Sequence, residues 1–120
     1  MIRIAVVAAL VLFAAGAARA ACLYPRAPER LPDGKTATHD EMVAAQQAVK
    51  QFDQDITAYT ACLTLEMTAL ENSGQYDAAR LEELRAMQFK KNDAAVDEVT
   101  AVVGEFNEQL RIFKARDEKD

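Results

Sequence analysis

The stretch from residue 38 to residue 63, THDEMVAAQQAVKQFDQDITAYTACL, decides the fold because its apolar residues recur at helical spacing. The steps alternate between three and four residues, the heptad repeat of a helix that buries one face. The residues on this face are Met42, Ala45, Val49, Phe52, Ile56, Tyr59 and Leu63. Thr38 and Glu41 fit a capping box, which predicts a helix start at residue 39. The turn signal at 72–74 predicts its end near residue 71.

A second helix is predicted over residues 77–114, which contain no proline and are rich in strong helix formers. Asp77 is placed to cap it. Its second half repeats the heptad spacing with Val96, Val99, Val103, Phe106, Leu110 and Phe113. Two long helices joined by a short loop predict an all-α fold. Residues 38–120 would form an antiparallel two-helix hairpin that resembles a coiled coil.

Residues 21–37, ACLYPRAPERLPDGKTA, form a proline-rich arm in front of the first helix. Pro25, Pro28 and Pro32 favour an extended backbone, since each fixes φ and lacks an amide donor. Extended at about 3.1 Å per residue, the arm is long enough to run back along the first helix from Thr38 to Cys62. A disulfide between Cys22 and Cys62 is therefore predicted; two free thiols or an intermolecular bridge are the alternatives.

Residues 1–20 have the pattern of a secretory signal peptide. Arg3 precedes an apolar run, and Ala18-Arg19-Ala20 forms an A-x-A site with cleavage expected after Ala20. An uncleaved anchor and a lipoprotein are the alternatives, although Arg19 stands where a lipobox requires a Leu-like residue. The pattern predicts a periplasmic or secreted protein.

The charge balance argues against several classes of partner. The whole chain has a net charge of −5. After loss of residues 1–20 all 19 acidic residues and 12 basic ones remain, which gives −7. Such a chain is repelled by nucleic acid and by anionic lipid. The mature part contains no second long apolar segment, so we expect no stable membrane insertion after signal cleavage.

No residue pattern for catalysis or for cofactor binding stands out. His39 is the only histidine, which excludes histidine-pair metal motifs. Adjacent carboxylates, such as Glu82 and Glu83, point in different directions on a helix and indicate a solvated face. C-x-x-C motifs and clustered glycines are missing from the sequence. We therefore predict no catalytic residue, no metal site, no cofactor and no enzymatic activity.

Four short segments resemble small exported helical proteins of proteobacteria, to which no activity is assigned. They are Cys22-x-x-Pro25, Tyr59-x-x-Cys62, the stretch from Asn92 to Glu98, and Glu105-Phe106-Asn107. The resemblance covers most of the mature chain. It implies export and a helical architecture, and it implies no activity.

The function that remains is binding of another protein, either an unknown partner or further copies of the same chain. The apolar seams are the candidate contact surface: Phe52, Ile56, Tyr59, Val99, Val103, Phe106, Leu110 and Phe113. Their ordinary role as a core is the competing interpretation. A small periplasmic holding chaperone is the alternative function.

Overall fold

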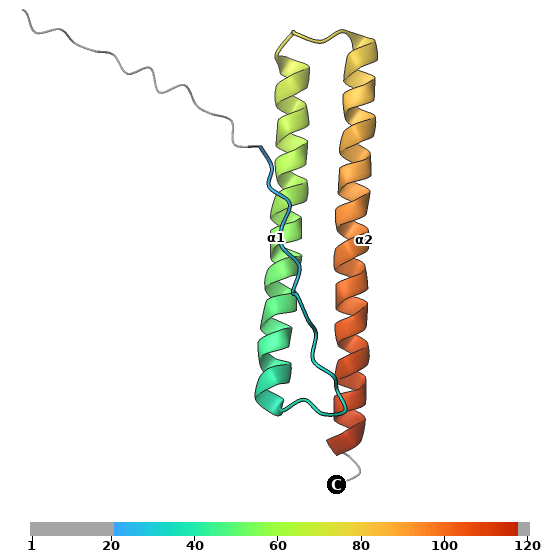
Figure 1. The fold of residues 1–120 in the computed structure, drawn as a ribbon. Coiled ribbons are helices and arrows are strands. Elements are labelled where there is room, and N and C mark those ends of the chain that lie inside the picture. Colours follow the sequence, from blue (N-terminus) through green and yellow to red (C-terminus); the bar gives the residue numbers. More distant parts are fainter. Residues whose placement is uncertain (1–20, 118–120) are drawn as a thin grey trace, which may run out of the picture.

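The computed structural model describes residues 21–117. These residues form two α-helices, α1 (His39–Asn72) and α2 (Ala78–Asp117), and contain no β-strand. The helices lie side by side, run in opposite directions and are joined by a short loop (Figure 1). The prediction of an all-helical fold with two packed helices is confirmed. The predicted signal peptide, residues 1–20, lies outside the described residues.

The ends of α1 follow from local chemistry. The Thr38 hydroxyl accepts a hydrogen bond from the Glu41 amide at 3.2 Å, and the Glu41 carboxylate accepts one from the Thr38 amide at 2.7 Å. This is the predicted capping box, which satisfies amides that the first turn leaves unpaired. At the other end Gly74 has φ of 68°, a left-handed conformation that glycine adopts without steric cost.

The start of α2 is capped by Asp77, whose carboxylate accepts a hydrogen bond from the Arg80 amide at 2.8 Å. Its last turn runs to Asp117, beyond the predicted end near residue 114. The Arg116 guanidinium donates to the carbonyls of Lys35 and Ala37, both at 2.8 Å, and lies 4.8 Å from the centre of the Phe113 ring. These contacts connect the end of α2 to the arm.

The core consists of two clusters of buried side chains between α1 and α2. One lies at mid-length: Phe52, Ile56, Tyr59, Leu63, Ala95 and Val99. The other lies at the end away from the loop: Ala37, Met42, Val49, Phe106 and Phe113. Val96 was predicted to lie in the α2 seam, but its side chain is 45% exposed, whereas Ala95 beside it is fully buried. The α2 seam is therefore rotated by one residue at this point.

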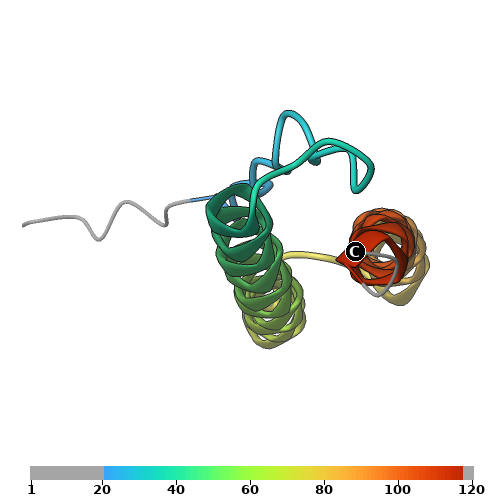
Figure 2. The same ribbon diagram turned by 90° about the horizontal axis from the view of Figure 1, so that it is seen from below.

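The arm, residues 21–37, covers one side of the helix pair and contacts both helices (Figures 1 and 2). Cys22 and Ala27 pack against the mid-length cluster, and Leu31 packs against the cluster at the end away from the loop. At the turn of the arm the Gly34 amide donates to the Gln109 side-chain oxygen at 2.8 Å. The arm begins beside Cys62, so among residues 21–117 only the two helices form the part of the hairpin nearest the loop.

Candidate interaction surface

The eight seam residues proposed from the sequence all lie in or beside the core. Six of them are buried: Phe52, Ile56, Tyr59, Val99, Phe106 and Phe113. Val103 and Leu110 are half-buried and pack against the clusters. Within the single chain these side chains are occupied in holding α1, α2 and the arm together. A contact surface for another molecule therefore has to be sought among the exposed residues.

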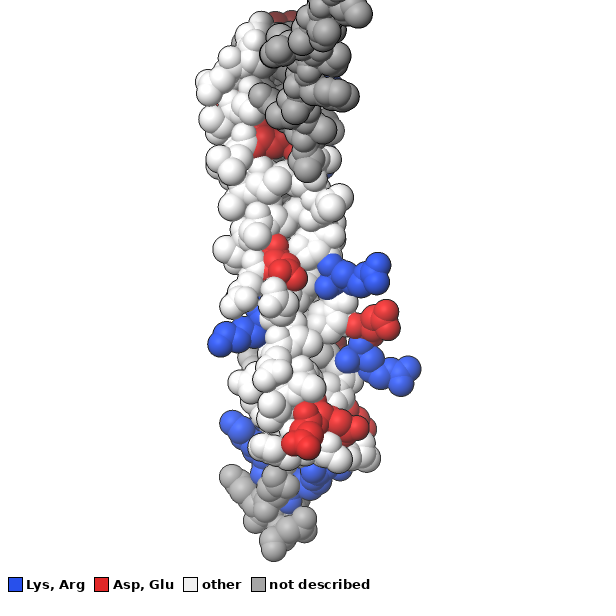
Figure 3. Space-filling model, turned by 90° about the vertical axis from the view of Figure 1, so that its left-hand side faces the viewer, with Lys and Arg blue, Asp and Glu red and all other residues white. Residues whose placement is uncertain are grey.

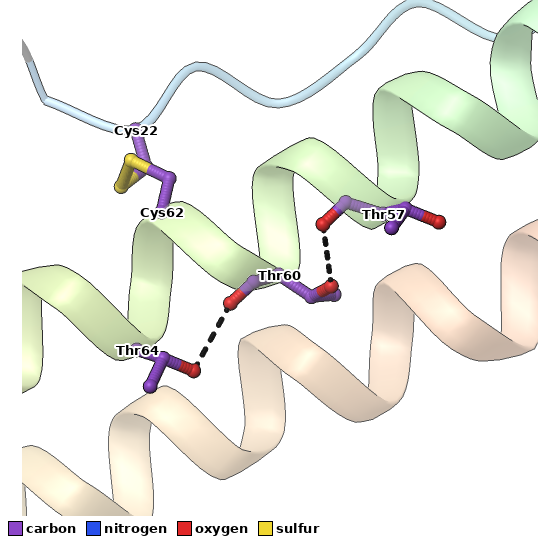
Figure 4. Close-up of a disulfide and its surroundings, with 5 residues drawn as sticks. All are labelled: Cys22, Thr57, Thr60, Cys62 and Thr64. Carbon is purple, nitrogen blue, oxygen red and sulfur yellow. Dashed lines mark hydrogen bonds between the residues drawn. A yellow bond between two sulfur atoms is a disulfide. The ribbon is translucent and has the colours of Figure 1, made fainter.

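The disulfide between Cys22 and Cys62 connects the arm to the middle of α1 and closes a sequence separation of 40 residues. Cys62 points from α1 toward the arm, as Figure 4 shows. Next to it the Tyr24 ring contacts the Tyr59 ring edge-on, with the ring centres 5.1 Å apart. The Tyr24 hydroxyl donates a hydrogen bond to the Glu98 carboxylate of α2. The start of the arm is thus joined to both helices.

The stability of the contacts between the start of the arm and the two helices depends on pH through the Tyr24 phenol. Partial burial, the hydrogen bond to Glu98 and the negative charge of that carboxylate together raise the pKa of Tyr24 from 10.0 to about 12, with burial the largest cause. The fold favours the neutral phenol, so this stabilisation is complete below pH 10 and is lost as the pH rises from 10 to about 12. We expect the free energy of unfolding of the wild type to fall more steeply over this range than that of Tyr24→Phe.

The measurement is a spectrophotometric titration of the tyrosinates combined with urea unfolding at each pH. Tyr24→Phe should remove the transition near pH 12. Glu98→Gln keeps a hydrogen-bond acceptor but removes the charge, so in that variant the pKa of Tyr24 should move back toward its ordinary value. An unchanged high-pH transition in Tyr24→Phe would contradict the assignment.

The most exposed large apolar side chains lie beside the disulfide. Leu23 is 85% exposed and Leu65 is 72% exposed, the highest values among such side chains in the described residues. Leu65 also borders a hollow next to the disulfide, whose other lining residues are Ala21, Cys22, Cys62, Glu66, Ala69 and Leu70. Two highly exposed leucines next to a largely apolar hollow form a patch that is unfavourable in water, which is typical of contact sites.

Leu65 belongs to a second heptad repeat on α1, on the face opposite the core. We call it the outer stripe: Gln47, Gln51, Gln54, Ala58, Ala61, Leu65, Thr68 and Asn72. All of these residues are exposed, and none is charged. A helix face in contact with water alone normally carries charged residues. The outer stripe therefore has the composition of a face that meets another surface.

Four threonines in or beside the outer stripe reduce the polarity of this surface further. The hydroxyls of Thr57, Thr60, Thr64 and Thr68 each donate to a backbone carbonyl three or four residues earlier, at 3.0 to 3.3 Å. Figure 4 shows two of these bonds. Because the donors are satisfied within the helix, contact with another molecule removes little hydration from them.

The charged residues are concentrated on α2. Its outward positions carry both signs, including Lys90, Asp93, Asp97, Glu108 and Arg111. On α1, by contrast, no charged residue occurs from Ile56 to Leu65. Figure 3 looks onto the α1 side and shows few charged side chains in the visible part of the half nearer the loop. The two helices thus present different surfaces, and that of α1 has the longer stretch without charge.

The polar residues considered for chemistry are dispersed. Among residues 21–117 no group of three or more His, Cys, Asp or Glu side chains is arranged to hold a metal ion. His39 is exposed at the start of α1, with its ring centre 6.5 Å from that of Phe113. Glu82 and Glu83 bind different arginines, Arg85 and Arg80. No helix in this part of the chain is long and apolar enough to cross a membrane.

No protein-family model, curated protein or solved structure matches this chain.

Two features of the surface escaped the sequence analysis. The outer stripe was missed because attention to apolar residues finds the core seam first. The signal was nonetheless present, since the absence of charge at heptad spacing can be read directly from the sequence. Leu23 was missed because an extended arm has no periodicity from which its exposed side can be inferred.

Proposed function

We propose that this chain is an exported, non-enzymatic protein that acts by binding another protein chain through the surface of α1 around the disulfide. The observation that carries the proposal is the exposure of Leu23 and Leu65 beside a charge-free face of α1. Exposed leucines of this kind cost solubility unless a partner covers them. The buried seam residues contribute indirectly, because they hold the hairpin that presents this face.

Export is supported by two features of different kinds. Residues 1–20 have the signal-peptide pattern, and the two cysteines of the sequence are joined in a disulfide, which persists in oxidising compartments. We propose cleavage after Ala20 and a periplasmic or secreted location. In this proposal the hairpin is coiled-coil-like, and the disulfide keeps the arm in place. The resemblance to small exported proteobacterial proteins supports the same location.

The test is site-specific photo-crosslinking in a bacterial periplasm, with the full chain expressed from its own leader. A photoreactive residue at Leu65 should give a crosslinked product of defined mass, because this position lies in the middle of the proposed surface. The same residue at Phe89 is the matched control, since it is 67% exposed but lies on α2. Equal or no crosslinking at the two positions would contradict the proposal. The mass of the exported chain should correspond to a start at Ala21 and be two hydrogens short.

A holding chaperone is the second candidate, favoured by further exposed apolar side chains on α2. Met87 is 49% exposed and borders a groove between the helices near the loop, and Phe89 is exposed as well. A chaperone would use such scattered groups to hold unfolded chains. Suppression of the aggregation of a reduced, unfolded client protein at equimolar ratio would favour this candidate. Binding restricted to one folded partner would favour the first.

A further inference from the structure

We propose that the partner bound by this surface is a second copy of the same chain, which packs antiparallel against the outer stripe of α1. The inference rests on the proposed binding function and gives it a definite partner. In a two-fold symmetric pair the same patch is used by both copies, so the patch has to be complementary to itself. The region around the disulfide meets this requirement.

The self-complementarity is first one of shape. Along the outer stripe, Ala61 and Leu65 are neighbours one helical turn apart, one small and one large. When two copies run antiparallel about a point midway between them, Leu65 of each copy packs over Ala61 of the other. Large side chains opposite small ones let two helices approach closely and interdigitate. The same register places Ala58 opposite Thr68, and Gln54 opposite Asn72.

The arm adds a second contact in this register. Leu23 follows Cys22, and its neighbour Tyr24 contacts Tyr59, so Leu23 lies near the level of residues 59–62 of α1. The two-fold axis brings this level opposite Leu65 and Glu66 of the second copy. The hollow beside the disulfide, bordered by Leu65 and Ala69, lies there. Leu23 of each copy thus covers the hollow of the other, and the two most exposed leucines are buried together.

The distribution of charge favours the outer stripe of α1 over the outward face of α2 as the contact between two copies. Without residues 1–20 the chain carries a net charge of −7, from 12 basic and 19 acidic residues, and two copies repel each other unless they meet where charge is absent. The outer stripe itself is free of charge over its whole length. Of the two carboxylates next to it, Glu71 is paired with Arg85 at 3.0 Å, and Glu66 is exposed at the border of the hollow. On α2 the outward positions would bring charged side chains into contact, at a desolvation cost.

The size of the contact sets the expected affinity. From Gln54 to Asn72 the overlap is about 27 Å long at 1.5 Å per residue. A strip of this length with the two leucine contacts buries on the order of 900 Å² in total, which is below the standard size of stable interfaces. We therefore expect a weak dimer with a dissociation constant on the order of 10 µM, populated only at raised concentration.

Sedimentation velocity of the oxidised mature chain, from about 1 to 300 µM, tests the proposal, and this range brackets the expected dissociation constant. We expect a monomer–dimer equilibrium. Leu65→Glu should raise the dissociation constant by at least about 100-fold, because each dimer then carries two charges at its centre and loses two leucine contacts. Phe89→Glu is the matched control and should leave it unchanged. Both sites are exposed, so circular dichroism should show the wild-type helix content.

The experiments distinguish failure of the proposed dimer from failure of the proposed binding function. A wild-type chain that stays monomeric at 300 µM, or a dimer equally affected by both substitutions, would overturn the proposed dimer. In those cases a crosslink from position 65 to a different protein would leave the binding function standing. A dimer that only Leu65→Glu dissociates supports the proposal, and the crosslinked product should then have twice the mass of the chain.

Discussion

Replacing Cys22 and Cys62 by serine is expected to lower the free energy of unfolding by about 4 kcal/mol. In the chain-entropy model a disulfide restricts the unfolded chain, and the restriction grows with the length of the closed loop, which here spans a separation of 40 residues. For a domain of this size the loss corresponds to a fall in melting temperature of roughly 20 °C. Thermal unfolding followed by circular dichroism measures it.

Reduction provides the control for this prediction. A reductant should lower the melting temperature of the wild type to that of the double serine variant and should leave the variant unchanged. The single variant Cys62→Ser should behave like the double one when its remaining thiol is kept reduced. A double variant as stable as the oxidised wild type would show that the arm holds its position without the covalent link.

Gly34→Ala is expected to destabilise the fold by about 3 kcal/mol, because the arm meets α2 too closely for a side chain at this position. A Cβ atom on Gly34 would lie 2.1 Å from the backbone oxygen of Gln109 and 3.0 Å from the backbone nitrogen of Phe113. Neither is the flexible end of a side chain, so the turn of the arm has to move away from the helix. The hydrogen bond from Gly34 to Gln109 and the packing of Leu31 are then lost.

Gly104→Ala is the matched control, because the same substitution meets empty space there. Apart from its chain neighbours and the adjacent backbone of α2 itself, no heavy atom lies within 4 Å of a Cβ at this position. Alanine has the higher helix propensity, so this variant should be more stable than the wild type by about 1 kcal/mol. Urea unfolding of both variants measures the difference. A loss of stability below about 0.5 kcal/mol in Gly34→Ala would contradict the close approach of the arm, because such small changes are typical of surface sites without special contacts.

Local chemistry and periodicity made most of the fold predictable. The capping box at Thr38 and Glu41 depends on residues three apart, and the core seam of α1 depends only on heptad spacing. The disulfide followed from a count of two cysteines and from the reach of the arm. The capping box and the seam each depend on residues within a few turns of one helix, and the disulfide depends on the length of the arm.

The register of α2 and the placement of the arm were not predictable in the same way. Choosing between Ala95 and Val96 for the core requires knowing how α2 faces α1, and an apolar scale prefers the valine that the structure exposes. The contacts of Gly34 with Gln109 and of Arg116 with Lys35 join residues about 80 positions apart. Such pairings have no local signature. The candidate surface shares this difficulty, since its contribution from Leu23 depends on where the arm lies.

The end of the arm at Cys62 also divides the hairpin into parts of unequal local stability. Beyond this point the described residues leave α1 and α2 covered only by each other, and Leu81 and Leu84 of α2 are half-buried. Amide hydrogens exchange with solvent through local openings, which need less free energy where fewer apolar contacts are broken. Amides near the loop should therefore exchange well before those of the arm-covered half. The hairpin would open from its loop end while the disulfide-linked half stays folded.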